Sequence, residues 1–270
     1  MNATQKKIYD LVFPLGEACS CTETLRKAGL QHLSFPFDWI THADPNDERA
    51  KHYVLYRAKD IASRFRGWFR PEDFALVSTK QGNGKDVYIN RALNLVFNHD
   101  FPSGMEFRHA FELVNARYRK RSARLLQLLG AAQRVLIVRM ERPCDKLLKP
   151  IPTLPEDCRE LRRVMGAAFP NATFDVFVFR FERGRAEKDL IEEEIEPGLT
   201  QVTFDYHDYK PGLLEFAVCL KRTAAILSSR FAVVDYRTPE EIHAYRQRLR
   251  RETLNRLLKP FKRLFRARNA

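Results

Sequence analysis

The sequence has no apolar run long enough to cross a membrane, and its apolar N-terminal stretch, "KIYDLVFPLG", is too short for the core of a signal peptide. We therefore expect a cytoplasmic protein. Only five cysteines occur in 270 residues, and in a reducing compartment we expect them to be thiols rather than a disulfide framework. A Gly-rich phosphate loop is also missing, because "GNG" at 82–84 has neither a preceding apolar strand nor the Lys-Ser/Thr of a P-loop.

Acidic residues are nearly absent from the C-terminal segment. Residues 246–270 hold ten Arg or Lys and one Glu, and so carry +9 of the formal net charge of +13. Leu254, Leu257, Leu258, Phe261, Leu264 and Phe265 form one stripe along this segment, and Pro260 predicts a kink. A basic helix with an apolar stripe is typical of peripheral attachment to an anionic membrane surface, here the inner membrane. Docking on the body of the protein is an alternative, and nucleic acid is the least favoured partner because phosphate binding needs no apolar face.

The remaining residues have the composition of a globular protein, with 44% hydrophobic residues and 20 Phe in the whole chain. Continuous apolar runs at 134–140 and 173–182 predict buried strands, with a helical pattern between them and another at 212–229. This alternation predicts the α/β class, with a mainly parallel sheet flanked by helices. We expect one domain over residues 1–245 and a basic amphipathic tail helix over 246–270.

Cys19 is the strongest candidate for chemistry, since "PLGEACSC" places it where an apolar strand gives way to a helical pattern. Free backbone N–H groups at a helix start favour a thiolate and can bind an oxyanion, which suits a nucleophile. The alternative is a buried core thiol. A zinc site at Cys19 and Cys21 would need two more ligands, and Cys144 and Cys158 are not a tight second pair. We expect no metal and no cofactor.

Two further segments offer partners for a nucleophile. "FNHDF" ends in His99 and Asp100, and a histidine at a strand end can act as a general base for a nearby thiol. "PFDW" sets Asp38 among aromatic residues, so its carboxylate should be partly buried and should have a histidine or backbone N–H groups as partners. "DYHDY" is a weaker candidate, in which Asp205 and His207 would share one face of a strand or lie at its exposed end.

These stretches together resemble a bacterial family of uncharacterised proteins described as papain-like cysteine peptidases. The resemblance covers "LGEACSCTETLRKAGL", "SFPFDWI", "FNHDF", "RYRKRSARLLQLLGAAQRVLIVR" and "ELRRVMGAAFPNATFDVFVFRFE", in that order, over residues 9–183. By this spacing Cys19, and not Cys21, falls on the family's cysteine. Proteins of this kind are often associated with bacterial surface polysaccharide biosynthesis. The resemblance implies a papain-like fold, but the strand pattern after residue 134 favours parallel α/β units instead.

We therefore expect a cysteine-dependent hydrolase or acyl transferase acting on a protein or glycan. Cys19 would be the nucleophile, His99 the base, and Asp38 the residue that orients the histidine, with Asp100 as its substitute. A second hypothesis is a transferase or accessory enzyme of surface polysaccharide assembly. Its anionic donor could be bound by Arg117, Arg119, Lys120, Arg121 and Arg139. A third is a non-catalytic scaffold recruited to the membrane.

Overall fold

The computed structural model describes residues 5–16, 18–80, 84–141, 151–182, 190–205, 213–244, 246–247 and 250. The chain forms two compact units, Met1–Val234 and Asp235–Ala270. In the second unit residues 239–244 are helical. Thr238 and Glu241 form a capping box there, in which each side chain accepts the backbone N–H of the other. Most of the predicted tail helix over 246–270 lies outside the described residues.

The first unit is built on a five-stranded sheet with the order β2-β7-β8-β10-β9. The strands are β2 (Leu11–Pro14), β7 (Arg134–Met140), β8 (Thr173–Glu182), β10 (Leu199–Asp205) and β9 (Ile191–Glu196). Strands β2, β7, β8 and β10 pair in parallel, whereas β9 is antiparallel to β10. The α/β class is confirmed. The expectation of a mainly parallel sheet is wrong, because this sheet is mixed and a second large sheet is antiparallel.

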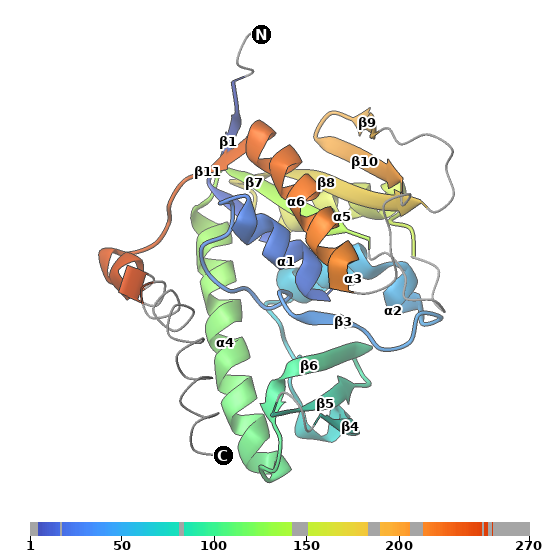
Figure 1. The fold of residues 1–270 in the computed structure, drawn as a ribbon, viewed down its shortest axis with the longest axis vertical. Helices are drawn as coiled ribbons and strands as arrows, with labels where there is room; N and C mark the ends of the chain where they lie inside the picture. Colours follow the sequence, from blue (N-terminus) through green and yellow to red (C-terminus); the bar gives the residue numbers. More distant parts are fainter. Residues whose placement is uncertain are drawn as a thin grey trace, which may run out of the picture. The chain divides into compact units, whose positions relative to one another are not determined.

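Both faces of this sheet are covered, which explains why its central strands are continuous apolar runs. On one face Leu136, Val138 and Phe177 join a core cluster with residues of α1 (Ala18–Lys27). α6 (Leu213–Arg230) lies beside α1 (Figure 1), and the hydroxyl groups of Thr24 and Thr223 join the two helices at 3.1 Å. Ile137 and Val176 point the opposite way and are equally buried.

A large insertion separates α1 from β7 along the chain. It contains a four-stranded antiparallel sheet with the order β3-β6-β5-β4. Its elements are β3 (Ile40–His42), α2 (Glu48–Lys51), α3 (Tyr53–Ala62), the 3-10 turn η1 (Pro71–Asp73), β4 (Phe74–Lys80), β5 (Lys85–Asn90), β6 (Leu95–Pro102) and α4 (Phe107–Ala131). α4 returns the chain to β7 (Figure 1). Helix α5 (Pro155–Ala168) joins β7 to β8 and packs on α3 and β8.

Aromatic rings form the core between the antiparallel sheet and α4. The ring of Phe69 lies 4.9 Å from that of Tyr118 on α4 and 5.7 Å from that of Phe97 on β6. Phe74 and Phe111 extend the cluster, with ring centroids 5.5 Å apart. Such pairs favour edge-to-face and offset geometries and add to the burial of apolar surface. Many of the 20 Phe residues therefore fix the insertion, and hence His99, to α4.

The edge of the first unit is closed by two short parallel strands, β1 (Lys7–Tyr9) and β11 (Phe231–Val233). Asp10 lies between β1 and β2, and its carboxylate accepts the backbone N–H groups of Gln133 and Arg134. The Asp10 side chain thus anchors the junction between β1 and β2 to the start of β7. None of the described helices combines the length and apolarity that a membrane span requires.

Candidate active site at the start of α1

Cys19 lies in the first turn of α1, directly after the carboxyl end of β2. Its side chain is partly exposed, and it is a thiol, as are Cys21 and Cys158 among the described residues. The first turn of a helix has backbone N–H groups without intrahelical partners, and the helix dipole places partial positive charge there. The predicted position of Cys19 at a strand-to-helix junction is confirmed.

Cys21 belongs to the core. It is fully buried in the cluster between α1 and the sheet, and its thiol donates to the carbonyl oxygen of Val138 at 3.3 Å. Burial raises the pKa of this thiol to about 12, although the nearby guanidinium of Arg139 acts in the opposite direction. Cys21 is therefore protonated at neutral pH and unsuited to nucleophilic attack.

Cys21 also explains the glycine three residues before Cys19. A Cβ atom on Gly16 would lie 2.0 Å from the Cβ of Cys21 and 2.7 Å from its sulfur. No side chain fits at residue 16 unless α1 moves away from the loop. The Gly16–Cys21 contact thus sets how closely the first turn of α1, which carries Cys19, approaches β2.

Asp38 is completely buried and has several partners. Its carboxylate accepts hydrogen bonds from Arg26 at 3.2 Å, from the Gln31 amide at 2.8 Å and from the Phe35 backbone N–H at 3.1 Å. Burial raises the pKa of Asp38 to about 6, and this effect outweighs the opposing influence of the Arg26 guanidinium. The Asp38 carbonyl also accepts the hydroxyl of Thr22. The residue therefore ties the "PFDW" segment to α1.

His99 lies next to this segment because β3 and β6 pair antiparallel, with Ile40 opposite Phe97. The imidazole is exposed and packs edge-on against the ring of Trp39, with centroids 6.1 Å apart. The guanidinium of Arg26 lies over the same indole, 5.2 Å from its centroid. Three segments distant in the sequence, those around Cys19, Asp38 and His99, thus meet through Arg26 and Trp39.

Asp100, the predicted substitute for Asp38, points the other way, into the interface with α4. It is 2% exposed and accepts the hydroxyl of Tyr118 at 3.0 Å and the guanidinium of Arg117 at 3.2 Å. Arg121 lies 3.9 Å away. Burial, and then the negative charge of Asp100, raise the pKa of Tyr118 well above its ordinary value. This cluster holds β6 on α4.

The contacts therefore join the predicted segments but not the predicted triad. Among the described residues no hydrogen bond links His99 to Cys19 or to Asp38. The catalytic roles of Cys19, His99 and Asp38 stay predictions. Arg26 and Trp39 were missed from the sequence, although a signal existed: Arg26 follows Cys19 by seven residues, so both lie on one side of α1, with Glu23 between them.

A second polar cluster, also missed, lies at the carboxyl ends of β7 and β8. Glu141 is 1% exposed and pairs with Arg180 at 3.1 Å. Arg139 donates to the hydroxyl of Thr153 at 3.2 Å and lies over the ring of Tyr53. Arg139 is as buried as Glu141, so it has no exposed surface with which to bind a donor substrate in the way the second hypothesis requires.

The remaining predicted residues add little to the site. Asp205 is the last residue of β10, and His207 lies outside the described residues. Within the described ranges, no group of three His, Cys, Asp or Glu side chains is arranged to hold a metal ion. Comparison of the chain with family models, with curated proteins and with solved structures finds no match in any of the three.

Proposed function

We propose that the protein is a cysteine-dependent hydrolase or acyl transferase with Cys19 as its nucleophile, in keeping with the resemblance to papain-like cysteine peptidases. The observation that carries the proposal is the position of a partly exposed thiol in the first turn of α1, at the carboxyl end of a parallel strand. Ligands of open α/β sheets bind at such strand ends. Cys21 is excluded as the nucleophile because it is buried and its pKa is raised.

The proposed reaction uses groups of the protein and its substrates only. His99 takes the proton of the Cys19 thiol, and the thiolate attacks a carbonyl carbon and forms a C–S bond. Backbone N–H groups of the first turn of α1 stabilise the oxyanion. The intermediate collapses to a thioester as the leaving group departs with a proton from His99. Water or an acceptor hydroxyl or amine then cleaves the thioester and restores the thiol. Water gives hydrolysis, and an acceptor gives acyl transfer.

His99 would approach Cys19 only when substrate is bound, since its ring packs on Trp39 in the free protein. General bases often reach hydrogen-bonding geometry only in the substrate complex. Asp38 then acts as a positioning residue: through Arg26 it holds the indole of Trp39, against which the imidazole rests. In this proposal the roles predicted for His99 and Asp38 are retained, with the orienting effect of Asp38 exerted through Arg26 and Trp39.

We also propose that the segment 246–270 is a basic amphipathic helix that attaches the protein to the anionic surface of the inner membrane. Its charge and its Leu/Phe stripe support this proposal. An acyl-transfer site at such a surface suits a substrate that is itself membrane-linked, such as a glycan precursor or a membrane protein.

The test is labelling of the intact protein with an iodoacetamide probe between pH 5 and 9, with the modified cysteines identified by mass spectrometry. We expect Cys19 to react at neutral pH, while Cys21 and Cys158 react only after unfolding, because burial raises both pKa values to about 12. Cys19→Ser should abolish the fast reaction and retain the fold. A Cys19 that reacts no faster than free cysteine at pH 7 would refute the proposal.

The base is tested separately with His99→Ala, compared with His109→Ala as a control, since His109 is also exposed. Turnover of a thioester substrate should fall by about 10²-fold or more in the first variant only, which is the usual contribution of a general base. Equal activity of the two variants would exclude His99 as the base.

A further inference from the structure

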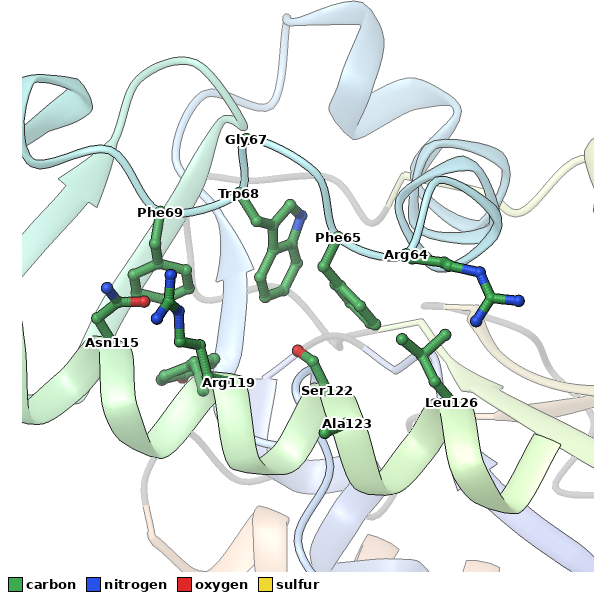
Figure 2. A pocket seen from close by; sticks show the side chains of 11 residues that line it. Arg64, Phe65, Gly67, Trp68, Phe69, Asn115, Arg119, Ser122, Ala123 and Leu126 are labelled. Atoms are coloured by element: carbon green, nitrogen blue, oxygen red, sulfur yellow. The ribbon is translucent and has the colours of Figure 1, made fainter. Parts of the chain in front are cut away.

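A cavity of about 330 Å³ lies between the loop after α3 and the side of α4 (Figure 2). The loop contributes Phe65, Trp68 and Phe69, whose rings point toward the helix. α4 contributes Asn115, Arg119 and Ser122, which follow one another at helical spacing along the facing side. The cavity uses none of the residues proposed for catalysis, and an inference about it does not depend on the role of Cys19.

The lining combines aromatic rings with positive charge. Phe65 and Phe69 are partly exposed, while Trp68 is packed beneath them with only 3% of its surface exposed. Figure 2 shows Arg119 and Asn115 near Phe69, and Arg64 at the other end, near Phe65. No carboxylate is found among the described residues that line the cavity. The site therefore favours an anionic ligand that also has a ring or another flat face.

Ser122 provides a polar group in the middle of the cavity. Its side chain is largely buried, with 8% of the residue exposed, and it lines the cavity. In Figure 2 its hydroxyl points toward the loop and not along the helix. A hydroxyl can both donate and accept, so a ligand with a hydroxyl or a ring nitrogen can form a hydrogen bond with it.

The backbone of the loop gives an independent indication. Arg64 and Phe65 have φ values of 56° and 58°, in the left-handed region that favours glycine. Their N–H groups bond to the carbonyl oxygens of Ile61 and Asp60, both at 2.8 Å, which is the Schellman arrangement that ends α3. Glycine is the usual residue at the position of Arg64. Non-glycine residues in this conformation are concentrated at functional sites, and both residues line the cavity.

We propose that this cavity binds a small phosphorylated ring compound, either a sugar phosphate or a mononucleotide. The ring packs against Phe65 and Phe69, its polar edge meets Ser122, and the phosphate binds the guanidinium of Arg119 beside Asn115. The volume is at the lower end of small-molecule sites, so it suits one ring and one phosphate better than a dinucleotide. Arginine is well suited to phosphate, and aromatic rings stack on bases or sugar faces.

The experiment is calorimetric titration of the full chain with uridine monophosphate, glucose 1-phosphate and inorganic phosphate, each up to millimolar concentration. Two charge-matched variants are compared, Arg119→Gln in the cavity and Lys120→Gln, an exposed neighbour on the same helix outside it. We expect one of the two ring compounds to bind at least tenfold more tightly than inorganic phosphate. Arg119→Gln should weaken this binding about tenfold or more, and Lys120→Gln less than twofold. The preferred compound identifies the class as nucleotide or sugar phosphate.

A second variant keeps the test independent of folding defects. Arg64→Gly places glycine where the backbone already favours it and removes one positive charge from the lining of the cavity. It should therefore raise the melting temperature of the free protein and still weaken binding of the anionic preferred compound. Three outcomes would overturn the proposal: no binding of either ring compound, inorganic phosphate binding as tightly as both, or equal losses in Arg119→Gln and Lys120→Gln.

Discussion

The guanidinium of Arg26 bridges two residues of the "PFDW" segment, because it lies 3.2 Å from the buried carboxylate of Asp38 and over the indole of Trp39. One side chain on α1 thus neutralises a charge in the interior and supports the ring against which His99 packs. Arg26 is itself about one third exposed, so the pair lies at the boundary between core and solvent.

Asp38 should make stability depend on pH in a direction opposite to that of most carboxylates. Its pKa is about 6 in the folded protein and 3.8 as an ordinary carboxyl, so the folded state binds the proton more tightly. This contribution to stability is present below pH 4 and is lost as the pH rises through 6. The free energy of unfolding in urea is measured for wild type and for Asp38→Asn. The excess of wild type over the variant should be roughly 2–3 kcal/mol larger at pH 4 than at pH 7. A difference that does not change with pH would contradict the raised pKa.

Arg26→Gln should destabilise the protein by about 1–2 kcal/mol at pH 7, because a buried carboxylate loses its cation while solvent still screens the pair. The same change in an Asp38→Asn background should cost much less. A double-mutant cycle measured by chemical unfolding gives the coupling between the two residues. Additive effects would show that the ion pair contributes nothing to stability.

Gly16→Ala should destabilise the protein by about 1–3 kcal/mol, since the added methyl group overlaps Cys21. It should also slow labelling of Cys19, because the first turn of α1 has to move. Gly130→Ala is the matched control near the end of α4, where a Cβ meets no atom within 4 Å. That variant should gain about 0.5–1 kcal/mol from helix propensity. Equal thermal stability of the two variants would show that Gly16 is not sterically required.

Attachment of segment 246–270 to a membrane surface should depend on charge. In sedimentation with vesicles, the full chain should bind those containing phosphatidylserine and not neutral ones, and binding should weaken as salt increases. Replacing Arg263 and Arg266 together by Gln should weaken binding roughly 30-fold, at about 1 kcal/mol per basic residue. The control replaces Arg91 and Arg108, which are exposed on the first unit. Equal losses in both double variants would assign the effect to net charge and not to this segment.

The sequence predicted the central elements of the fold because their signals are local. The apolar run at 134–140 is β7 to the residue, and the run at 173–182 is β8. The mixed sheet was not predicted, because β9 has the sequence "IEEEIE" and shows neither apolar alternation nor an apolar run. This strand forms because β10 offers it a free edge, which is a property of the tertiary fold.

The sequence predicted which segments lie at the site, but it did not predict the contacts between them. The aromatic neighbours of Asp38 predicted partial burial, whereas its burial is complete. A histidine or backbone N–H groups were the expected partners, and the backbone N–H of Phe35 is one of those observed. The pairing of the Asp38 carboxylate with Arg26 depends on how the "PFDW" segment turns back onto α1. No local sequence pattern encodes that turn. The cavity beside α4 depends in the same way on the loop at 64–69 meeting one side of the helix.

Asp10 and Arg134 are in contact but lie 124 residues apart in the sequence, with the whole insertion between them. Strand β2 therefore pairs with β7 only after the antiparallel sheet and α4 have been synthesised. Pairing over such a distance is slow, since a long loop must be closed before any contact offsets its entropy. During synthesis, β2, the strand that precedes Cys19, stays unpaired until residues 135–138 follow. The proposed nucleophile is thus synthesised before the strand that completes its native surroundings.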